Sequence, residues 1–445
     1  NPFCLMTSRR NFLQLTASSL AFPFVARTSW AQSSPNGRVQ HASFGGGGMA
    51  MTDLRNIAKH THVDVRAIAE IDPQRREKAG NQFKQARVYA DWREMLEKEG
   101  DELDTVNVST PDHMHASMAM QSMQRGIHVY GQKPLTHGVA ESRVLTEYAR
   151  KKKLVTQMGI QCHSMKEYRT AVRLVHEGAI GKLVEAHSFS DKTWGDPNPK
   201  PDRKDPVPEG LDWDQWVGPA PFHDYIRGYY HPGNWRKRLD YGGGTFGDMG
   251  CHIYDPTFKA LGLTYPISLK SVGSSPNEHN WGVDAVVEYQ FPQTPYSEGK
   301  VLPVTWYDGS ARPPARVLSM LEGKPLPKQG SVIIGTEGVM LLPHLGMPSL
   351  YPQKKFEKFV IRPESGTNHW HDFIDAVRGV KEMPSANFDY SGPLTETILL
   401  GGIASHFPGV NLLWNGEKLE FTGHADATAL VQREYREGWS VQGLG

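Results

Sequence analysis

The stretch "VQHASFGGGGMAMTDL", residues 39–54, decides the fold of the amino-terminal half. A short apolar run is followed by four glycines and then by residues with helical spacing, which predicts a strand, a tight turn and a helix. Gly45, Gly47 and Ala50 form the pattern G-x-G-x-x-A. Its glycines permit the turn and the close approach of a pyrophosphate, and its small third residue lets the helix pack on the strand. The helix N-terminus then faces the phosphates. The pattern predicts a dinucleotide site that includes Gly45, Gly47, Gly48 and Met49.

An acidic residue follows the second predicted strand, as this kind of site requires. Glu70 lies 25 positions after Gly45, close to the roughly 20 expected. A carboxylate there hydrogen-bonds a ribose 2′-hydroxyl and repels a 2′-phosphate, so the sequence favours NAD over NADP. Asp72 is the second candidate for this role, and Arg75 and Arg76 leave NADP open.

Strands and helices alternate regularly in the first part of the chain. The pattern predicts strands at 39–44, 63–72, 103–110 and 127–135, and helices at 53–60, 91–99, 115–126 and 139–153. Such alternation is typical of an α/β fold with a Rossmann-like, doubly wound parallel sheet. We therefore assign residues 36–157 to an NAD(P)-binding domain.

The pattern changes after residue 158. A helix is predicted at 165–178 and another at 368–379, and several strand-like segments lie between them. A proline-rich stretch, 195–221, is predicted to be an ordered loop. We assign 158–445 to an α+β domain with an open, mainly antiparallel sheet that binds substrate.

The amino terminus is predicted to be an export signal. "SRRNFLQ", residues 8–14, contains a twin arginine, and a short apolar region and small residues around Ala31 follow it. We expect residues 1–35 to be a twin-arginine signal that directs the protein to the periplasm. The apolar region is too short to span a membrane, and no later segment is long enough.

Composition limits the classes of function. The chain has 445 residues, a formal net charge of +1 and 22% charged residues, so nucleic acid and membrane surfaces are not expected partners. Of three cysteines, Cys4 lies in the expected signal. Cys162 and Cys251 are too few for a disulfide framework, although export leaves one bridge open.

Asp248 and His252 lie four residues apart, directly after "YGGGTFG". On a helix they share one face. Three interpretations of this pair are open: metal ligands, a base with its orienting carboxylate, or an ordinary helix start. The spacing matches no strong zinc pattern, so we expect no metal.

Four stretches together resemble the glucose–fructose oxidoreductase / inositol dehydrogenase (Gfo/Idh/MocA) family, in an exported branch. They are the glycine turn, "STPDHMH" (109–115), "GQKPL" (131–135) and "GDMGCH" (247–252). The resemblance implies that Lys133, from the family's E-K-P motif, lies beside the nicotinamide and the reacting carbon. It matches Asp248 and His252 to the family's D-x-x-x-H pair. One departure is Gln132, which replaces the usual glutamate and removes a negative charge near Lys133.

Oxidation of a sugar hydroxyl assigns roles to these residues. Histidine has a suitable pKa for a general base, so we assign the base to His252. Lys133 would steady the developing alkoxide, and Asp248 would orient the imidazole or hold a second hydroxyl. The resemblance also implies that Thr110, Pro111 and His115 lie beside the cofactor, and further cofactor contacts are expected from Ser109, Gln132 and Gln161.

The substrate side is expected to present aromatic and polar groups suited to carbohydrate. An aromatic face stacks on sugar C–H groups, while an arginine holds hydroxyls or a carboxylate. The candidates are His163, Trp194, Tyr230, Trp235, Arg236 and Tyr241.

Export combined with a dinucleotide site favours a tightly bound NAD that is recycled within the protein. The predicted function is an NAD(P)-dependent oxidoreductase acting on a sugar, polyol or glycoside hydroxyl. The alternatives are an NAD-dependent glycoside hydrolase that works by oxidation, elimination, hydration and reduction, and a non-catalytic sugar-binding protein. By analogy with the family, a homo-oligomer is expected.

Overall fold

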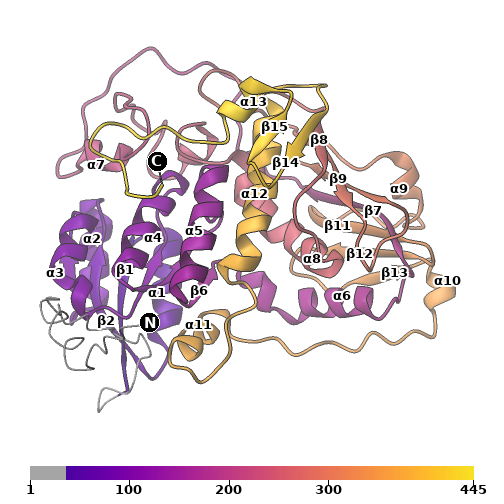
Figure 1. The fold of residues 1–445 in the computed structure, drawn as a ribbon, viewed down its shortest axis with the longest axis horizontal. Coiled ribbons are helices and arrows are strands. Elements are labelled where there is room, and N and C mark those ends of the chain that lie inside the picture. The colour runs from indigo at the N-terminus through magenta and orange to yellow at the C-terminus, as the bar shows by residue number, and fades with distance from the viewer. Residues whose placement is uncertain (1–36, 445) are drawn as a thin grey trace, which may run out of the picture.

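The computed structural model describes residues 37–444, so the expected signal and Cys4 lie outside the described residues. A six-stranded sheet forms the first half, with strand order β3-β2-β1-β4-β5-β6 and parallel pairing throughout (Figure 1). This confirms the predicted doubly wound sheet. Its strands are β1 (Val39–Phe44), β2 (Val63–Ala69), β3 (Arg87–Tyr89), β4 (Thr105–Val108), β5 (His128–Gly131) and β6 (Thr156–Met158).

Helices join these strands and cover the sheet. They are α1 (Gly48–Ala58), α2 (Pro73–Gln82), α3 (Trp92–Glu99), α4 (His115–Gln124) and α5 (Val139–Lys152). The sequence does not predict α2, β3 or β6. Helix α2 is polar and has a single buried residue, Ala79, so it lacks a marked apolar face.

A nine-stranded sheet forms the core of the second half, in the order β13-β12-β11-β7-β10-β9-β8-β14-β15. Only the β7–β10 pair within it is parallel, which confirms a mainly antiparallel sheet. The strands are β7 (Leu183–Ser190), β8 (Ser268–Ser271), β9 (Val286–Pro292), β10 (Val301–Tyr307), β11 (Gln329–Gly335), β12 (Val339–Pro343), β13 (Ser349–Tyr351), β14 (Leu412–Asn415) and β15 (Glu420–Thr422).

The helices of the second half lie against this sheet or reach back to the first. They are α6 (Lys166–His176), α7 (Trp213–Val217), α8 (Cys251–Leu261), α9 (Ala315–Ser319), α10 (Gln353–Phe356), α11 (His369–Val377), α12 (Phe388–Ser405) and α13 (Ala425–Ala429). Helix α8 continues from a π-helical turn, Phe246–Gly250. Such turns are rare and often mark functional sites.

Two late helices pack on the first half of the chain. Helix α12 runs beside α5 between the two sheets (Figure 1), where Arg143 of α5 makes a bidentate pair with Glu396 at 2.9 and 2.8 Å. Helix α11 packs on α1, and Trp370 Nε1 donates to Asp53 Oδ1 at 2.9 Å. The cofactor half is therefore completed by residues from late in the second half of the chain.

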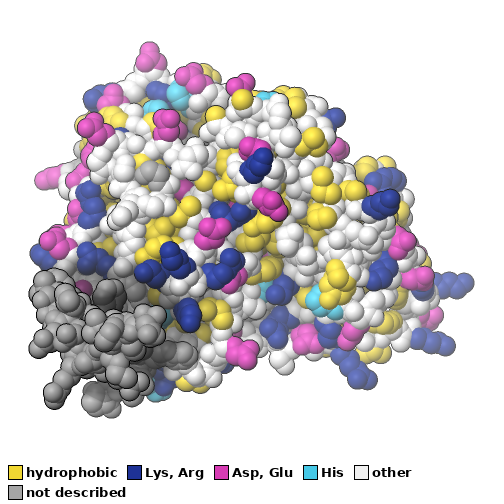
Figure 2. Space-filling view, in the orientation of Figure 1, with side chains coloured by type: hydrophobic (Ala, Val, Ile, Leu, Met, Phe, Trp, Pro, Cys, Tyr) yellow, Lys and Arg dark blue, Asp and Glu magenta, His cyan; other side chains and the backbone are white. Residues whose placement is uncertain are grey.

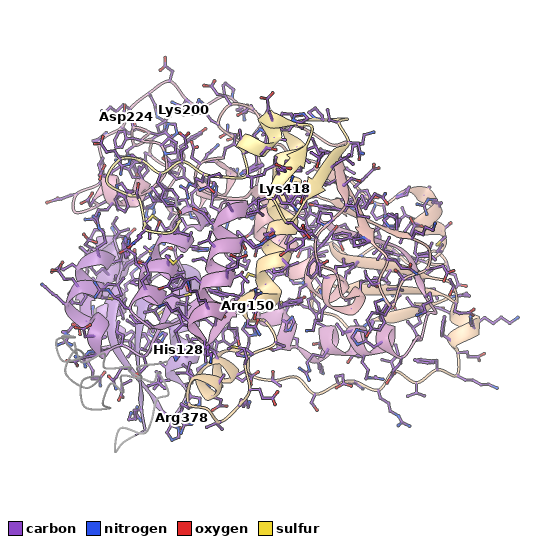
Figure 3. All side chains as sticks on the ribbon, viewed as in Figure 1. His128, Arg150, Lys200, Asp224, Arg378 and Lys418 are labelled. Atoms are coloured by element: carbon purple, nitrogen blue, oxygen red, sulfur yellow. The ribbon has the colours of Figure 1, made fainter. Side chains whose placement is uncertain are left out.

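Both signs of charge are interspersed on the face drawn in Figure 2, as the small net charge leads one to expect. The proline-rich excursion, which carries Lys200, lies above the first sheet, with Asp224 nearby (Figure 3). Cys162 and Cys251 are buried free thiols, so they form no bridge. Across residues 37–444, no helix has the length and apolar character to cross a membrane.

Candidate active site

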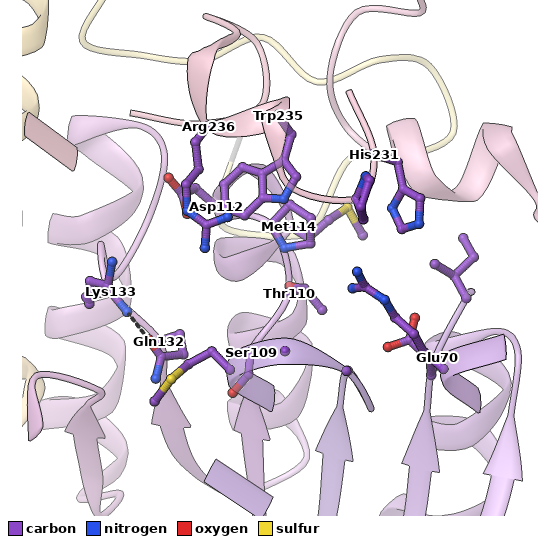
Figure 4. A pocket seen from close by; sticks show the side chains of 18 of the residues that line it. Glu70, Ser109, Thr110, Asp112, Met114, Gln132, Lys133, His231, Trp235 and Arg236 are labelled. Carbon is purple, nitrogen blue, oxygen red and sulfur yellow. Dashed lines mark hydrogen bonds between the residues drawn. The ribbon is translucent and has the colours of Figure 1, made fainter. Parts of the chain in front are cut away.

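A cavity of about 440 Å³ opens between the two halves, beyond the carboxyl ends of the parallel strands (Figure 4). This is the edge at which open α/β sheets bind their ligands. Fifteen residues that the sequence singles out line it: Gly45, Gly47, Gly48, Met49, Glu70, Ser109, Thr110, Pro111, Gln132, Lys133, Gln161, Trp235, Arg236, Asp248 and His252.

The glycine turn forms one end of the cavity. Gly45 has φ +102°, and a Cβ there would lie 2.7 Å from the carbonyl oxygen of Ser109, so only glycine fits without displacement. Helix α1 begins after Gly47 and has no side-chain cap, which leaves its first N–H groups available to an anion. The side chain of Arg75 lies against Gly47 and also lines the cavity. The turn thus has the geometry of a pyrophosphate site.

Glu70 supports this turn. Its carboxylate accepts hydrogen bonds from the backbone N–H of Gly46 at 2.8 Å and of Asp72 at 2.9 Å. It still lines the cavity, where a carboxylate suits a ribose hydroxyl. Asp72, the second candidate, does not line the cavity. Its side chain caps α2 and accepts a hydrogen bond from His231 Nε2 at 2.8 Å, so its cofactor contact stays a prediction.

Gln132 belongs to a buried network around Asp53. Gln132 Nε2 and Ser109 Oγ donate to Asp53 Oδ2 at 2.9 and 2.8 Å, and Trp370 donates to the other oxygen. Burial raises the pKa of Asp53 to about 6, although these donors lower it. A glutamate at 132 would place a second carboxylate beside Asp53, so the amide is the compatible group. The departure from the family pattern therefore has a local electrostatic reason.

Lys133 receives its negative partner from the second half of the chain. Its Nζ donates to the backbone oxygen of Asp248 at 2.6 Å and to Oδ1 at 2.9 Å. Arg236 Nε lies 3.2 Å from the same Oδ1, and Lys192 Nζ lies 3.5 Å from Oδ2. Burial acts to raise the pKa of Asp248, but Lys133, Arg236 and Lys192 hold it well below its usual range. Asp248 is therefore an anion shared by three cations.

His252 has no hydrogen bond to Asp248. Its Nδ1 is buried without a partner among residues 37–444. Burial lowers the pKa of His252 well below its ordinary value, and Lys133 and His344 lower it further. The imidazole is therefore neutral near pH 7. The expectation that Asp248 orients this ring is wrong for this arrangement, because the carboxylate faces the cations instead.

Four ionisable residues of the lining were missed from the sequence: Asp112, Lys192, His231 and His344. Asp112 follows Pro111 at the end of β4, and its Oδ2 accepts the backbone N–H of Gly243 at 3.1 Å. Burial raises the pKa of Asp112 to about 7. The sequence signal for Asp112 was its place in the "STPDHMH" stretch. No neighbouring motif points to Lys192, His231 or His344.

Two histidines that were predicted to contact cofactor or substrate form hydrogen bonds within the protein instead. His115 places both ring nitrogens on backbone oxygens, Nδ1 on Pro134 and Nε2 on Thr110, each at 2.8 Å. It is buried and does not line the cavity, so its contact with the cofactor stays a prediction. His163 joins Asp255 and Ser385, each at 2.8 Å, at a separate depression. Its substrate contact likewise stays a prediction.

Three predicted aromatic residues lie behind the site. Tyr230 and Tyr241 belong to a buried aromatic cluster, with ring centroids 5.3 Å apart, and do not line the cavity. Trp194 also stays outside it, but its ring lies 5.5 Å from the guanidinium carbon of Arg236. The ring of Trp235 lies 4.2 Å from that carbon. These rings position Arg236, and among the predicted aromatic residues Trp235 alone reaches the cavity.

No group of three or more His, Cys, Asp or Glu residues in the described part of the chain is placed to hold a metal ion. Three residues of the lining have a buried side-chain atom without a partner there: Trp92 Nε1, Gln161 Oε1 and His252 Nδ1. Buried polar groups normally have a partner, so each marks a place for a ligand. The lining therefore fits a dinucleotide along the glycine turn, with its reactive end toward Lys133 and His252.

Comparison with known proteins places this arrangement in a family. The oxidoreductase family with an NAD-binding Rossmann fold (Gfo/Idh/MocA) matches residues 40–160, and the C-terminal alpha/beta domain of the same oxidoreductase family matches residues 198–441. The levoglucosan dehydrogenase of Pseudarthrobacter phenanthrenivorans is 26% identical over 30% of this chain and 34% of its own length. Glycosyl hydrolase family 109 protein 1 of Shewanella sp. strain ANA-3 is 29% identical over 30% of this chain and 29% of its own.

These two matches span about a third of the curated relatives' own lengths. The matches to solved structures extend over more of both chains. The WlbA dehydrogenase of Chromobacterium violaceum, in complex with NADH and UDP-GlcNAcA, superposes with a TM-score of 0.61 at 15% identity, over 85% of this chain and 96% of that one. The agreement extends across both halves of the fold. Since the two family matches together cover most of the described residues, this chain belongs to the Gfo/Idh/MocA oxidoreductase family.

Proposed function

We propose that this protein is an NAD-dependent dehydrogenase that oxidises a CH–OH group of a carbohydrate or polyol and keeps its cofactor tightly bound. One observation carries the proposal: Lys133 and the neutral His252 line the same cavity as the glycine turn of an NAD-binding oxidoreductase fold. A proton acceptor and a cationic hydrogen-bond donor beside a nicotinamide are the groups that alcohol oxidation needs.

The residues that would hold NAD are distributed along the cavity. The turn from Gly45 and the first N–H groups of α1 would take the pyrophosphate, and Glu70 would take the ribose. Gln161 would offer its unpartnered oxygen at the far end. When bound, NAD supplies the hydride acceptor.

The chain's own side chains would perform the remaining steps. Lys133 donates a hydrogen bond to the substrate oxygen and stabilises the negative charge that develops on it. His252 accepts the hydroxyl proton, because burial beside Lys133 keeps its imidazole neutral. Asp248 holds the Lys133 ammonium in place through the 2.9 Å pair.

A second candidate is an NAD-dependent glycoside hydrolase. The similarity to glycosyl hydrolase family 109 protein 1 supports it. Oxidation of the C3 hydroxyl would acidify the C2–H, so that loss of this proton expels the aglycone from C1. Addition of water across the resulting C1–C2 double bond and return of the hydride to C3 would then complete the hydrolysis. The same base and cation would serve both directions of hydride transfer. Release of aglycone without net NADH would identify this activity.

We further propose export by the twin-arginine route to the periplasm, which rests on the "SRRNFLQ" stretch. A protein outside the cytoplasm benefits from retaining its nucleotide. We also propose a homo-oligomer, supported by exposed apolar side chains on strands of the second sheet, such as Val301 and Leu413. Denaturation of the purified protein should release nicotinamide nucleotide into the supernatant, and light scattering should give more than one protomer. An absence of nucleotide would refute tight retention.

The test of activity is a panel of sugars, polyols and glycosides added to the nucleotide-loaded protein, followed at the absorbance band of NADH. The proposed function predicts reduction by at least one of them. Lys133→Met and His252→Gln are the variants that should lose it. Ligand binding without any change of absorbance or release of aglycone would instead identify a non-catalytic sugar-binding protein.

A further inference from the structure

Three cations meet around one carboxylate at the substrate end of the cavity. Lys133, Arg236 and Lys192 lie 2.9, 3.2 and 3.5 Å from Asp248. Figure 4 shows Lys133 and Arg236 on the side of the cavity opposite Glu70. The group therefore lies away from the glycine turn and carries an excess of positive charge.

Neither of the two other acidic residues of the lining places a full negative charge at this end of the cavity. The acidic residues that line it are Glu70, Asp112 and Asp248. Glu70 is held at the glycine turn by the N–H of Gly46. Asp112 is deeply buried and its pKa lies near 7, so its carboxyl is only partly ionised at neutral pH.

Arg236 is held in position by its neighbours and still has unused donors. Trp235 and Trp194 place rings 4.2 and 5.5 Å from its guanidinium carbon. Its Nε donates to Asp248, and its two terminal nitrogens make no hydrogen bond within residues 37–444. Arg236 and Lys192 retain 29% and 43% side-chain exposure, so both can reach a ligand. A planar fork of this kind suits a carboxylate or a phosphoryl group.

We infer that the substrate is an acidic carbohydrate, whose carboxylate or phosphoryl group is bound by Lys192 and Arg236. This inference rests on the proposed function, since it names the substrate class of the same site. Lys133 is left to the reacting hydroxyl, while the other two cations fix the far end of the sugar. The anion restores local charge balance, and water excluded from the cavity strengthens its attraction to both cations.

The test is equilibrium binding to the NAD-loaded protein by calorimetry, with D-glucuronate, D-gluconate and D-glucose 6-phosphate against D-glucose and D-sorbitol. Each acidic sugar of the recognised shape should bind at least about 10-fold more tightly than its neutral counterpart. Lys192→Gln and Arg236→Gln should each lower the affinity for the acidic sugar by about 10-fold and so reduce its advantage over the neutral counterpart. Lys354→Gln, an exposed lysine of α10, is the matched control and should bind as wild type. Retained nucleotide in each variant shows that the fold and the cofactor end are intact.

The outcomes separate this inference from the proposed function. Tighter binding of the carboxylate sugars identifies a carboxylate as the recognised group, and tighter binding of the phosphate ester identifies a phosphoryl group. Equal or tighter binding of the neutral sugars, no binding of any acidic sugar, or an acid preference that survives both substitutions overturns the inference. A neutral sugar that reduces bound NAD would overturn it and leave the proposed function standing. Tighter binding of an acidic sugar without turnover of any sugar would support the inference and overturn the proposed function.

Discussion

The carboxyl of Asp112 should make the stability of this protein depend on pH. Burial raises its pKa from an ordinary 3.8 to about 7. The folded protein then keeps this proton up to about pH 7, while the unfolded chain releases it near pH 4. A gap of about three pKa units corresponds to about 4 kcal/mol of differential stability.

The sign follows from the direction of the shift. Because the folded pKa is raised, the contribution is fully present below about pH 4, is lost as the pH rises to about 7, and is constant above that. Asp112→Asn removes the titration but keeps an oxygen that can accept the N–H of Gly243. The free energy of unfolding of the variant minus that of wild type should therefore be about 2 to 3 kcal/mol larger at about pH 8 than at about pH 5.

The assay is the melting temperature of variant minus wild type, measured from acidic to mildly alkaline pH. The difference should rise by a few degrees up to neutral pH and then level off. Asp224→Asn is the matched control, because Asp224 lies on the outer loops (Figure 3) with a side chain 49% exposed and removes the same charge from the surface. A difference that stays constant, or that falls as the pH rises, would refute the assigned burial of the Asp112 carboxyl.

Further variants probe the site and its support. Lys133→Met should lower kcat by about 100-fold or more and retain nucleotide, since it removes the donor to the reacting oxygen; loss of nucleotide instead would contradict that role. His252→Gln should lower kcat by about 100-fold or more at neutral pH, and a wild-type rate would exclude it as the base. Gly45→Ala should abolish nucleotide retention because a Cβ there meets backbone at 2.7 Å, whereas Gly178→Ala, also at positive φ but in open space, should retain it; equal retention would contradict the turn. Trp370→Phe should lower stability by about 1 to 3 kcal/mol through the loss of its buried hydrogen bond, seen as a lower melting temperature; an unchanged temperature would show that the bond contributes little.

The cofactor half could be predicted well because its signals are local. A strand, a glycine turn and a helix in immediate succession specify the dinucleotide site, and the structure forms β1, the turn and α1 there. The second half was predicted only in outline. Strands β9 and β10 carry alternating buried positions, but nothing in one chain states which strands pair.

Helix α12 shows what the sequence could not reveal. It contains Gly392, Pro393 and Gly401, which argue against a helix on propensity alone. Packing overrides propensity here, since a Cβ at Gly392 would lie 2.1 Å from Thr146 and one at Gly401 would lie 2.1 Å from Tyr289. The glycines let the helix fit tightly between the two halves.

The substrate side was the least predictable part of the site. Tyr230 and Trp235 look alike as candidates, yet one packs in a cluster and the other reaches the cavity. Lys192 follows β7 and carries no local mark. It becomes significant only because Asp248, far along the chain, lies beside it. Such groups are defined by tertiary contacts, which a single sequence does not specify.

The return of α11 and α12 to the first sheet constrains how this protein can be re-engineered or made. A chimera with its breakpoint after β6 would give Asp53 and Arg143 foreign partners, because Trp370 and Glu396 belong to the later part of the chain. A successful exchange of substrate modules must therefore carry the two late helices along with the nucleotide module. During synthesis, the same arrangement means that the nucleotide module reaches its finished form only after both helices have left the ribosome.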